Sequence, residues 1–275
     1  MLGLEASEDG DLIRRSASGD REAFVAVARR HGPAVHRLCA AVLGNDADAS
    51  DATQEALLVA FRRASTYRAE RGPVRPWLLA IARREAYRLR PRGHEAPITD
   101  EAPLGALGVR AGWSAEDPEA LLARAEDVEA LARAIAALDP KDREVLVLRD
   151  LEGQSGEQAA LVLGVDLAAM KSRLHRARLK LMAALREGST SMAEQERTAG
   201  GLRCGQVLEL LSDYVDGELS PSVRAQVDEH LKGCVVCERF GGRFGRTIAG
   251  LRRGLEQRPA IDPEAFEAVL AHLRR

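Results

Sequence analysis

The C-terminal part of the chain carries three potential metal ligands within eight residues, in the stretch HLKGCVVC. His230, Cys234 and Cys237 follow the spacing H-x3-C-x2-C, and Gly233 allows a sharp turn between the histidine and the first thiol. Structural zinc takes four ligands in tetrahedral geometry, and Cys204 is the natural fourth because it is the only other cysteine in this part of the chain. We therefore expect a site for one zinc ion. The alternative is a reduced CxxC beside a surface histidine.

Composition favours a helical protein without membrane segments. The 275 residues are rich in alanine, leucine and arginine, with 30% charged and 4% aromatic residues. No apolar run approaches the roughly 18 residues of a membrane-spanning helix, and the N-terminal sequence MLGLEASEDGD is acidic where a secretory signal is basic. We expect an all-α, cytoplasmic protein with no membrane contact. The net charge of −2 does not exclude nucleic-acid binding, because local charge governs that contact.

Residues 8–92 are expected to form a first helical domain. Apolar residues recur at helical spacing from Phe24 to Val42, and Gly44 ends that helix. The next helix, 46–64, begins with acidic and ends with basic residues, which is the charge order that a helix dipole favours. After a break at 71–73, a third helix is predicted from Pro76 onwards, because proline fits the first turn.

A segment rich in proline and glycine, 93–116, indicates a linker to a second domain at 117–187. Asp139-Pro140 starts one helix of that domain, and Ser155 with Gln158 forms a potential capping box for the next. Residues 164–166 then turn the chain into a long helix that ends near Glu187. Two helices joined by a short turn with glycine are typical of a helix-turn-helix, whose second helix enters the major groove of DNA.

The second helix of this motif has an apolar face and a basic surface. The apolar face, at spacings of three and four residues, is expected to pack in the core: Met170, Leu174, Ala177, Leu181, Leu185. The other faces carry the cations Lys171, Arg173, Arg176, Arg178, Lys180. A basic surface can be an ordinary solvated face, but its place in a helix-turn-helix favours contact with DNA.

Residues 188–200 indicate a second linker, and residues 201–275 a third domain that holds the ligands. Ser220-Pro221 opens a helix whose last turn carries His230. Beyond the ligands, apolar residues recur among many arginines from Arg239 onwards, which favours a packed amphipathic helix over a second DNA site. Cys39 falls on an apolar helical face and is expected to be a core thiol.

Two blocks of the sequence resemble the extracytoplasmic-function sigma factors of bacterial RNA polymerase. The segment DADASDATQE at 46–55, with PWLLAIAR at 76–83, looks like sigma region 2, and LDPKDREV at 138–145, with KSRLHRAR at 171–178, looks like region 4. The resemblance implies a promoter-specificity subunit whose partners are RNA polymerase core and promoter DNA. For polymerase binding it implies Asp48, Asp51 and Gln54. For promoter DNA it implies Arg83, Arg84, Arg88, Lys171, Ser172, Arg173 and Arg176.

The sequence departs from the family pattern near the helix-turn-helix. Ala168-Ala169-Met170 stands where the family usually has Gly-Thr-Val, which removes a hydroxyl that could bind phosphate. Ala159 replaces a bulky aliphatic residue and Gly156 replaces an aromatic one. We expect these changes to affect DNA affinity more than the fold.

The C-terminal ligands, with the stretch YVDGELSP at 214–221, resemble the zinc-binding anti-sigma domain. Such domains are usually separate proteins that bind a sigma factor, so here the domain would contact its target within one chain. Tethering gives an effective concentration of up to about millimolar, so release would need metal loss, cysteine oxidation or competition by polymerase. Positive regulation stays open, and so does the choice between a structural and a sensing metal.

Two hypotheses from other classes compete with a sigma factor. A DNA-binding metal or redox sensor acting without polymerase would explain the helix-turn-helix and the cysteines, but it leaves the block from Asp46 to Ala82 unexplained. A thiol oxidoreductase would use Cys234 and Cys237, but no alternation of strands and helices surrounds them. We therefore expect no enzymatic activity.

Overall fold

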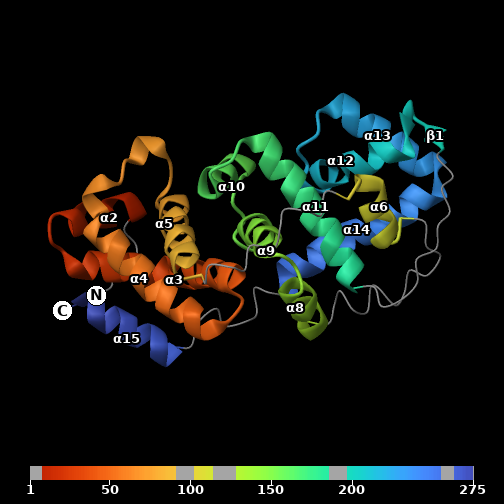
Figure 1. The fold of residues 1–275 in the computed structure, drawn as a ribbon. Helices are drawn as coiled ribbons and strands as arrows, with labels where there is room; N and C mark the ends of the chain where they lie inside the picture. Colours follow the sequence, from red (N-terminus) through yellow and green to blue (C-terminus); the bar gives the residue numbers. More distant parts are fainter. Residues whose placement is uncertain (1–7, 91–101, 114–127, 186–196, 255–262, 275) are drawn as a thin grey trace. The chain divides into compact units, whose positions relative to one another are not determined.

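The structure is a computed structural model that describes residues 8–90, 102–113, 128–185, 197–254 and 263–274. Within these ranges the regular elements are helices, apart from one two-stranded hairpin (Figure 1). The predicted all-α class is confirmed. None of the described helices combines the length and the apolar character needed to cross a bilayer.

The chain divides into two compact units, each built from stretches that are distant in sequence. The first unit takes residues 1–94, 147–170 and 258–275, and the second takes 95–146 and 171–257. These units and the domains expected from the sequence are different divisions of the chain, because residues 147–170 and the last helix both group with the first unit.

Four helices in the N-terminal part of the chain build the first unit: α2 (Asp9–Ala17), α3 (Arg21–Leu43), α4 (Asp46–Arg62) and α5 (Val74–Leu89). Two 3-10 turns, η1 (Ala64–Thr66) and η2 (Ala69–Arg71), precede α5. Asp20 caps α3 by accepting a hydrogen bond from the Ala23 amide, and Asn45 caps α4 through the Asp48 amide. Gly44 ends α3 as predicted, in the left-handed conformation with φ 81°.

The helix predicted from Pro76 begins two residues earlier, at Val74. Pro73 supplies the extended residue before the helix, with φ −62° and ψ 161°. Pro76 still lies in the first turn, where its missing N–H costs no hydrogen bond.

The core of the first unit lies between α3, α4 and α5, and Phe24, Leu57 and Leu79 are fully buried in it. Cys39 lies in the same core, as predicted. Burial raises the pKa of the Cys39 thiol to about 12, so this cysteine is an unreactive packing residue at neutral pH.

The first half of the helix-turn-helix also packs in the first unit. A π-helical stretch, η3 (Val147–Leu151), is followed by α10 (Gly156–Leu163), which lies against α5. The predicted capping box is present, because the Ser155 hydroxyl accepts from the Gln158 amide at 3.2 Å and the Gln158 side chain accepts from the Ser155 amide at 3.0 Å. Between the two elements, the buried carboxylate of Glu152 forms ion pairs with Arg37 and Arg75.

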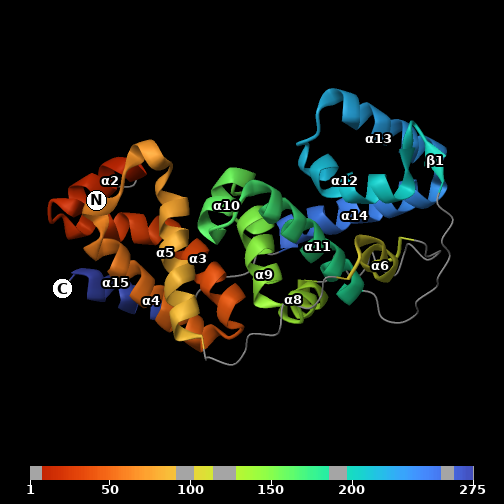
Figure 2. The same cartoon turned by 45° about the horizontal axis from the view of Figure 1, so that its top comes forward.

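The C-terminal helix, α15 (Pro263–Arg274), packs on α3 and α4 of the first unit (Figure 2). The Phe266 ring lies against Gly32 of α3, so closely that a Cβ atom at position 32 would overlap the ring. Two ion pairs support this contact: Arg29–Glu267 at 3.1 Å and Arg274–Glu22 at 3.0 Å.

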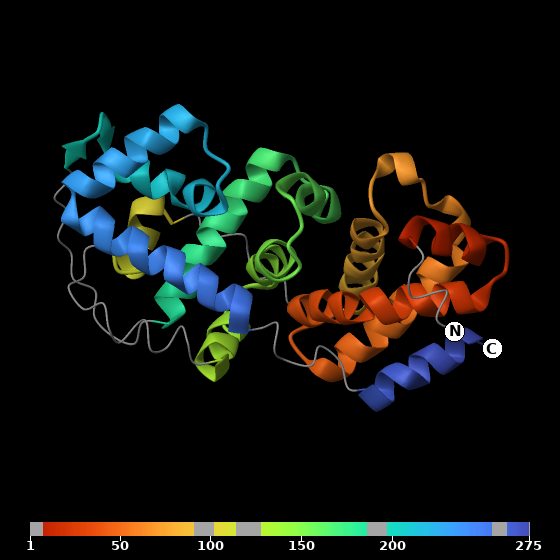
Figure 3. The ribbon, with the colours of Figure 1, turned by 180° about the vertical axis from the view of Figure 1, so that it is seen from behind.

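The second unit packs the C-terminal helices on the rest of the helix-turn-helix. Its first elements are α6 (Leu104–Arg110), α8 (Val128–Ala136), α9 (Pro140–Leu146) and the part of α11 (Leu167–Leu185) that follows Met170. The strands β1 (Thr198–Ala199) and β2 (Leu202–Arg203) pair antiparallel, and they precede α12 (Cys204–Asp216), α13 (Pro221–Gly233) and α14 (Val235–Gly254). Figure 3 shows α14 as the long helix on the rear face of this unit.

The predicted apolar faces of α11 and α14 are confirmed. All five residues expected in the core from α11 are buried, and so are four apolar residues that recur along α14 after Arg239: Phe240, Phe244, Ile248, Leu251. One hydrophobic cluster contains Leu179 and Met182 of α11 together with residues of α12 and α14.

The segment predicted as a linker, 93–116, contains the helix α6, which packs on α12. Leu107 and Ala111 of this segment are fully buried in the same cluster. Leu104, Leu107 and Ala111 stand three and four residues apart, so a short apolar stripe is present among the glycines that indicated a linker.

Candidate metal centre and nucleic-acid interface

The four predicted metal ligands come together from three elements. Cys204 begins α12 directly after the β1–β2 hairpin, and His230 lies in the last turn of α13. Cys234 lies between α13 and α14, and Cys237 lies in the first turn of α14. Their ligand atoms all lie within 4.8 Å of one another, and all four residues are buried.

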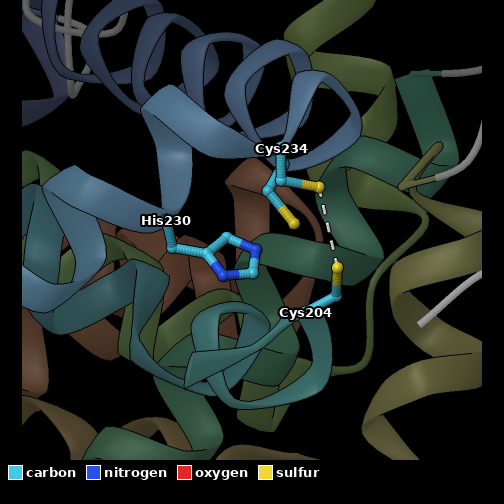
Figure 4. A group of neighbouring side chains, drawn as sticks. Cys204, His230 and Cys234 are labelled. Atoms are coloured by element: carbon cyan, nitrogen blue, oxygen red, sulfur yellow. Dashed lines mark hydrogen bonds between the residues drawn. The ribbon is translucent and has the colours of Figure 1, made fainter. Parts of the chain in front are cut away.

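The geometry of the cluster suits a single ion. The Sγ atoms of Cys204 and Cys234 are 3.7 Å apart, and Figure 4 shows His230 and these two cysteines directed toward one another. Three thiols and one imidazole are the donors of a closed structural zinc site, whose sulfur and nitrogen ligands surround the metal tetrahedrally.

The orientation of His230 tests whether this set fits a metal. Its Nδ1 atom lies 3.1 Å from the carbonyl oxygen of Ala199 and 3.0 Å from that of Leu202, so Nδ1 carries the hydrogen and Nε2 keeps its lone pair. Nε2 is buried and has no hydrogen-bond partner among the described residues. A buried lone pair directed at three thiols fits a metal ligand.

The hairpin supplies these carbonyl groups because it approaches α13 closely. Gly200 has φ 56°, and a Cβ atom there would lie 2.7 Å from the Gln226 oxygen and 2.9 Å from the His230 amide. Glycine is therefore required at position 200, both for the left-handed backbone and for the space.

The thiols differ in acidity before any metal binds. Burial raises the pKa of Cys204 and of Cys237. Burial also acts to raise the pKa of Cys234, but hydrogen bonds from the Cys237 amide and from the neighbouring thiols outweigh it and lower this pKa. Cys234 is thus the thiol that ionises most readily, and a bound cation would favour the thiolate form of all three.

The basic surface of α11 lies against the C-terminal helices of the second unit. The Lys171 ammonium lies 3.1 Å from Asp213 and 2.8 Å from Glu218. Arg178 donates two hydrogen bonds to the Asp216 carboxylate, at 2.9 and 3.0 Å, and its side chain is fully buried. Arg178, which helical spacing places outside the apolar face of α11, is therefore not solvated, because α12 covers it.

The other predicted DNA contacts of α11 differ in exposure. Arg173 lies 3.8 Å from Glu144, and Arg176 donates to the Ala102 carbonyl at 2.8 Å. Ser172 is exposed. Within the second unit, therefore, the cations of this set have partners from the same chain.

The predicted sites of region 2 lie on α4 and α5. Asp48 and Asp51 are exposed, and Gln54 is half-buried. On α5, Arg84 and Arg88 are exposed and both form ion pairs with Glu85, while Arg83 stacks on the Tyr87 ring at 4.7 Å.

Sequence patterns did not indicate the three carboxylates that contact α11, namely Asp213, Asp216 and Glu218, which we call the acidic cluster. They occur within six residues around the end of α12, close to Gly217, where φ is 73°. Their spacing indicates an acidic helix end, but only the fold shows that cations of α11 lie opposite.

Three family profiles match the chain. Residues 27–93 match "Sigma-70 region 2", residues 128–181 match "Sigma-70, region 4", and residues 204–237 match a family described as "Putative zinc-finger". The region 2 match covers the whole block from Asp46 to Ala82, which a stand-alone DNA-binding sensor leaves unexplained.

The chain is similar to curated sigma factors over about two thirds of its length. It is 32% identical to the RNA polymerase sigma factor CnrH of Cupriavidus metallidurans over 185 residues, which are 65% of this chain and 95% of CnrH. It is also 32% identical to the ECF RNA polymerase sigma factor SigM of Mycobacterium tuberculosis over 182 residues, 65% of this chain and 85% of SigM. A solved structure, CnrH in complex with the cytosolic domain of CnrY, aligns with a TM-score of 0.46 and 27% identity over 64% of this chain and 96% of that one.

Proposed function

The chain belongs to the extracytoplasmic-function RNA polymerase sigma factors, and on this premise we propose that its C-terminal domain inhibits promoter binding by covering α11. We call residues 197–254 the zinc domain, because the Cys3His cluster and the zinc-finger match favour zinc as its metal. Sigma factors bind RNA polymerase core and promoter DNA, so the protein is a transcription factor and not an enzyme.

The buried pair between Arg178 and Asp216 is the observation that carries this proposal. An arginine that contacts DNA must be able to reach the phosphates, whereas the side chain of Arg178 is fully buried and bonded at both ends of its fork to one carboxylate. Arg252 of α14 also reaches Asp216, at 2.7 Å, so the carboxylate is held in place by the zinc domain itself.

Competition with DNA follows from the chemistry of these contacts. A protein gains DNA affinity by placing lysine and arginine side chains on phosphates. The acidic cluster takes the same cations, because Lys171 pairs with Asp213 and Glu218 and Arg178 pairs with Asp216. A recognition helix must also enter a major groove about 12 Å wide, which leaves no room for α12 beside it. DNA and the zinc domain therefore exclude one another on this face.

The proposed polymerase contacts are not covered in the same way. Asp48 and Asp51, on α4, are exposed in the first unit even though α15 packs on α3 and α4. We therefore expect the inhibited protein to keep polymerase affinity and to lack promoter affinity. Polymerase and a promoter together would then compete with the tethered zinc domain, whose effective concentration is up to about millimolar.

Transcription from a cognate promoter tests this function. Reconstituted core polymerase is combined with the full chain or with a chain stopped after Glu187, each with and without a zinc chelator. We expect the shortened chain to be more active than the full chain, and chelation to activate only the full chain. Equal activity of the two chains would remove the inhibitory role, and failure of both to support transcription would remove the sigma function.

A further inference from the structure

Residues 102–113 fall between the parts of the chain that match sigma regions 2 and 4, and they pack on the zinc domain. We call them the interdomain segment. Its residues Leu107 and Ala111 are fully buried, in a cluster with Val207, Leu208 and Leu211 of α12. The segment therefore packs on an apolar surface of α12 and is not a solvated connection.

Helix α6 packs closely on this surface of α12. A Cβ atom at Gly108 would lie 2.6 Å from Cδ2 of Leu208, whereas a Cβ atom at Gly105, one turn earlier, would meet nothing within 4 Å. A side chain at position 108 would force Leu208 to move, whereas position 105 has room for one. The same substitution at the two glycines would give the same gain in helix propensity, so a difference between the two variants reports on packing alone.

Arginines from two neighbouring helices bind both ends of the segment. Arg176 of α11 donates to the Ala102 carbonyl at 2.8 Å, and Arg243 of α14 donates to the Gly112 carbonyl at 2.6 Å. Arg243 is itself buried, with 3% of its surface exposed, so its hydrogen bond is made out of contact with water. These bonds fix the register in which the segment lies.

The segment ends at the metal centre. Gly112 has φ 96°, and the Trp113 amide donates to the Gly108 carbonyl at 2.8 Å, which turns the chain back over α6. The Trp113 indole neighbours the Cys237 thiol, and because an indole N–H can only donate, the sulfur would be the acceptor between them. Trp113 also packs against the cluster that contains Cys204, Cys234 and Cys237.

We infer that the interdomain segment is an intramolecular ligand of the metal-loaded zinc domain, and that Trp113 is the hydrogen-bond donor that positions the Cys237 thiolate. A donor to a ligating sulfur orients it and balances its charge, and loss of such a partner typically costs about 10- to 100-fold in metal affinity. By linkage, metal binding strengthens docking of the segment by the same factor. The regulatory meaning rests on the proposed function: the zinc domain holds the connection between the two promoter-binding regions as well as α11.

Zinc affinity of the full-length protein tests the inference without polymerase or DNA. Zinc is titrated against a competing chelator for Trp113→Phe, which keeps an aromatic ring but loses the N–H group. The matched control is Trp77→Phe, because Trp77 is the only other tryptophan and packs on Tyr67 in region 2. We expect Trp113→Phe to weaken zinc binding about tenfold or more and Trp77→Phe to leave it unchanged.

A second pair of variants tests docking without touching the hydrogen bond. Gly108→Val should displace α6 and weaken zinc binding, and Gly105→Val should not. In the Trp77→Phe protein, Trp113 is the only tryptophan, so its emission should shift to longer wavelength when zinc is removed and the indole meets water.

Equal zinc affinities for Trp113→Phe and Trp77→Phe, or for the two glycine variants, would overturn the inference. An unchanged Trp113 emission wavelength on removal of zinc would overturn it as well. Such a result leaves the covering of α11 intact. Conversely, an uninhibited full chain whose zinc affinity depends on Trp113 would refute the proposed function and leave the inference standing.

Discussion

The substitution Asp216→Ala should open the contact between α11 and the zinc domain. Arg178 is fully buried and Asp216 nearly so, and removal of one partner from a buried pair costs about 3–5 kcal/mol because the other charge stays desolvated. Opening lets Arg178 reach water, so this cost favours the open state. At about 1.4 kcal/mol for each factor of ten, the open population should rise about 100- to 4,000-fold.

Amide hydrogen exchange of the full-length protein measures this opening directly. Amides of α11 between Leu174 and Met182 should exchange faster in Asp216→Ala by that factor, provided that bound zinc stays stoichiometric. Arg252→Met is the control for the domain itself, because it removes a pair within the zinc domain and keeps Asp216 with Arg178. Glu218→Ala is the control for exposure, since its pair with Lys171 is partly solvated and contributes about 0–1 kcal/mol.

The relative exchange rates of α11 in the three variants show whether the Arg178–Asp216 pair holds the contact. Asp216→Ala should exceed both controls in exchange rate and in promoter binding with core polymerase. If Asp216→Ala exchanges no faster than Glu218→Ala, the buried pair does not hold the contact and the reasoning from burial is refuted.

Three further predictions concern pH, metal and the C-terminal helix. His175 of α11 lies against α12, with its Nδ1 atom 2.9 Å from the Ser212 hydroxyl. Burial, followed by the nearby Arg178 and Arg176, lowers the pKa of His175 to about 4, and opening of the contact between α11 and the zinc domain should return this pKa to about 6.5. The contact should therefore be fully stable well above pH 6.5 and lose about 2 kcal/mol by pH 5, which melting curves of wild type and His175→Gln should show as a difference confined to acid. Cys204→Ser should abolish stoichiometric zinc binding and lower the melting temperature of the second unit, whereas Cys39→Ala should leave zinc content unchanged by elemental analysis. Gly32→Leu should displace Phe266 and speed hydrogen exchange throughout α15, and unchanged protection there would contradict the close packing.

Features that depend on a few neighbouring residues were predictable from the sequence. The H-x3-C-x2-C spacing identified three ligands, and the capping box at Ser155 and the left-handed Gly44 marked helix ends, because each follows from local hydrogen bonding or backbone geometry. Cys204 was identified by the number of ligands that zinc requires.

Features that depend on which surfaces meet were not predictable in the same way. Helical periodicity places Arg178 outside the core of the helix-turn-helix. Its side chain is buried because α12 packs over it, and the sequence pattern of α11 does not predict that contact. The glycines of the predicted linker concealed α6, because the apolar stripe there is short and its partner lies about a hundred residues later in the sequence. Glu152 is buried for a comparable reason, since Arg37 and Arg75 come from distant helices.

The cluster that joins α11 to α12 and α14 has a consequence for how such a protein survives in a crowded cell. Leu179 and Met182 of α11 share one hydrophobic core with Phe240 and Phe244 of the zinc domain, so separating the two would expose an apolar surface that is prone to aggregation. On the proposed inhibition of α11, the zinc domain would also protect α11 from aggregation, and release would be safe only when another macromolecule covers the exposed face.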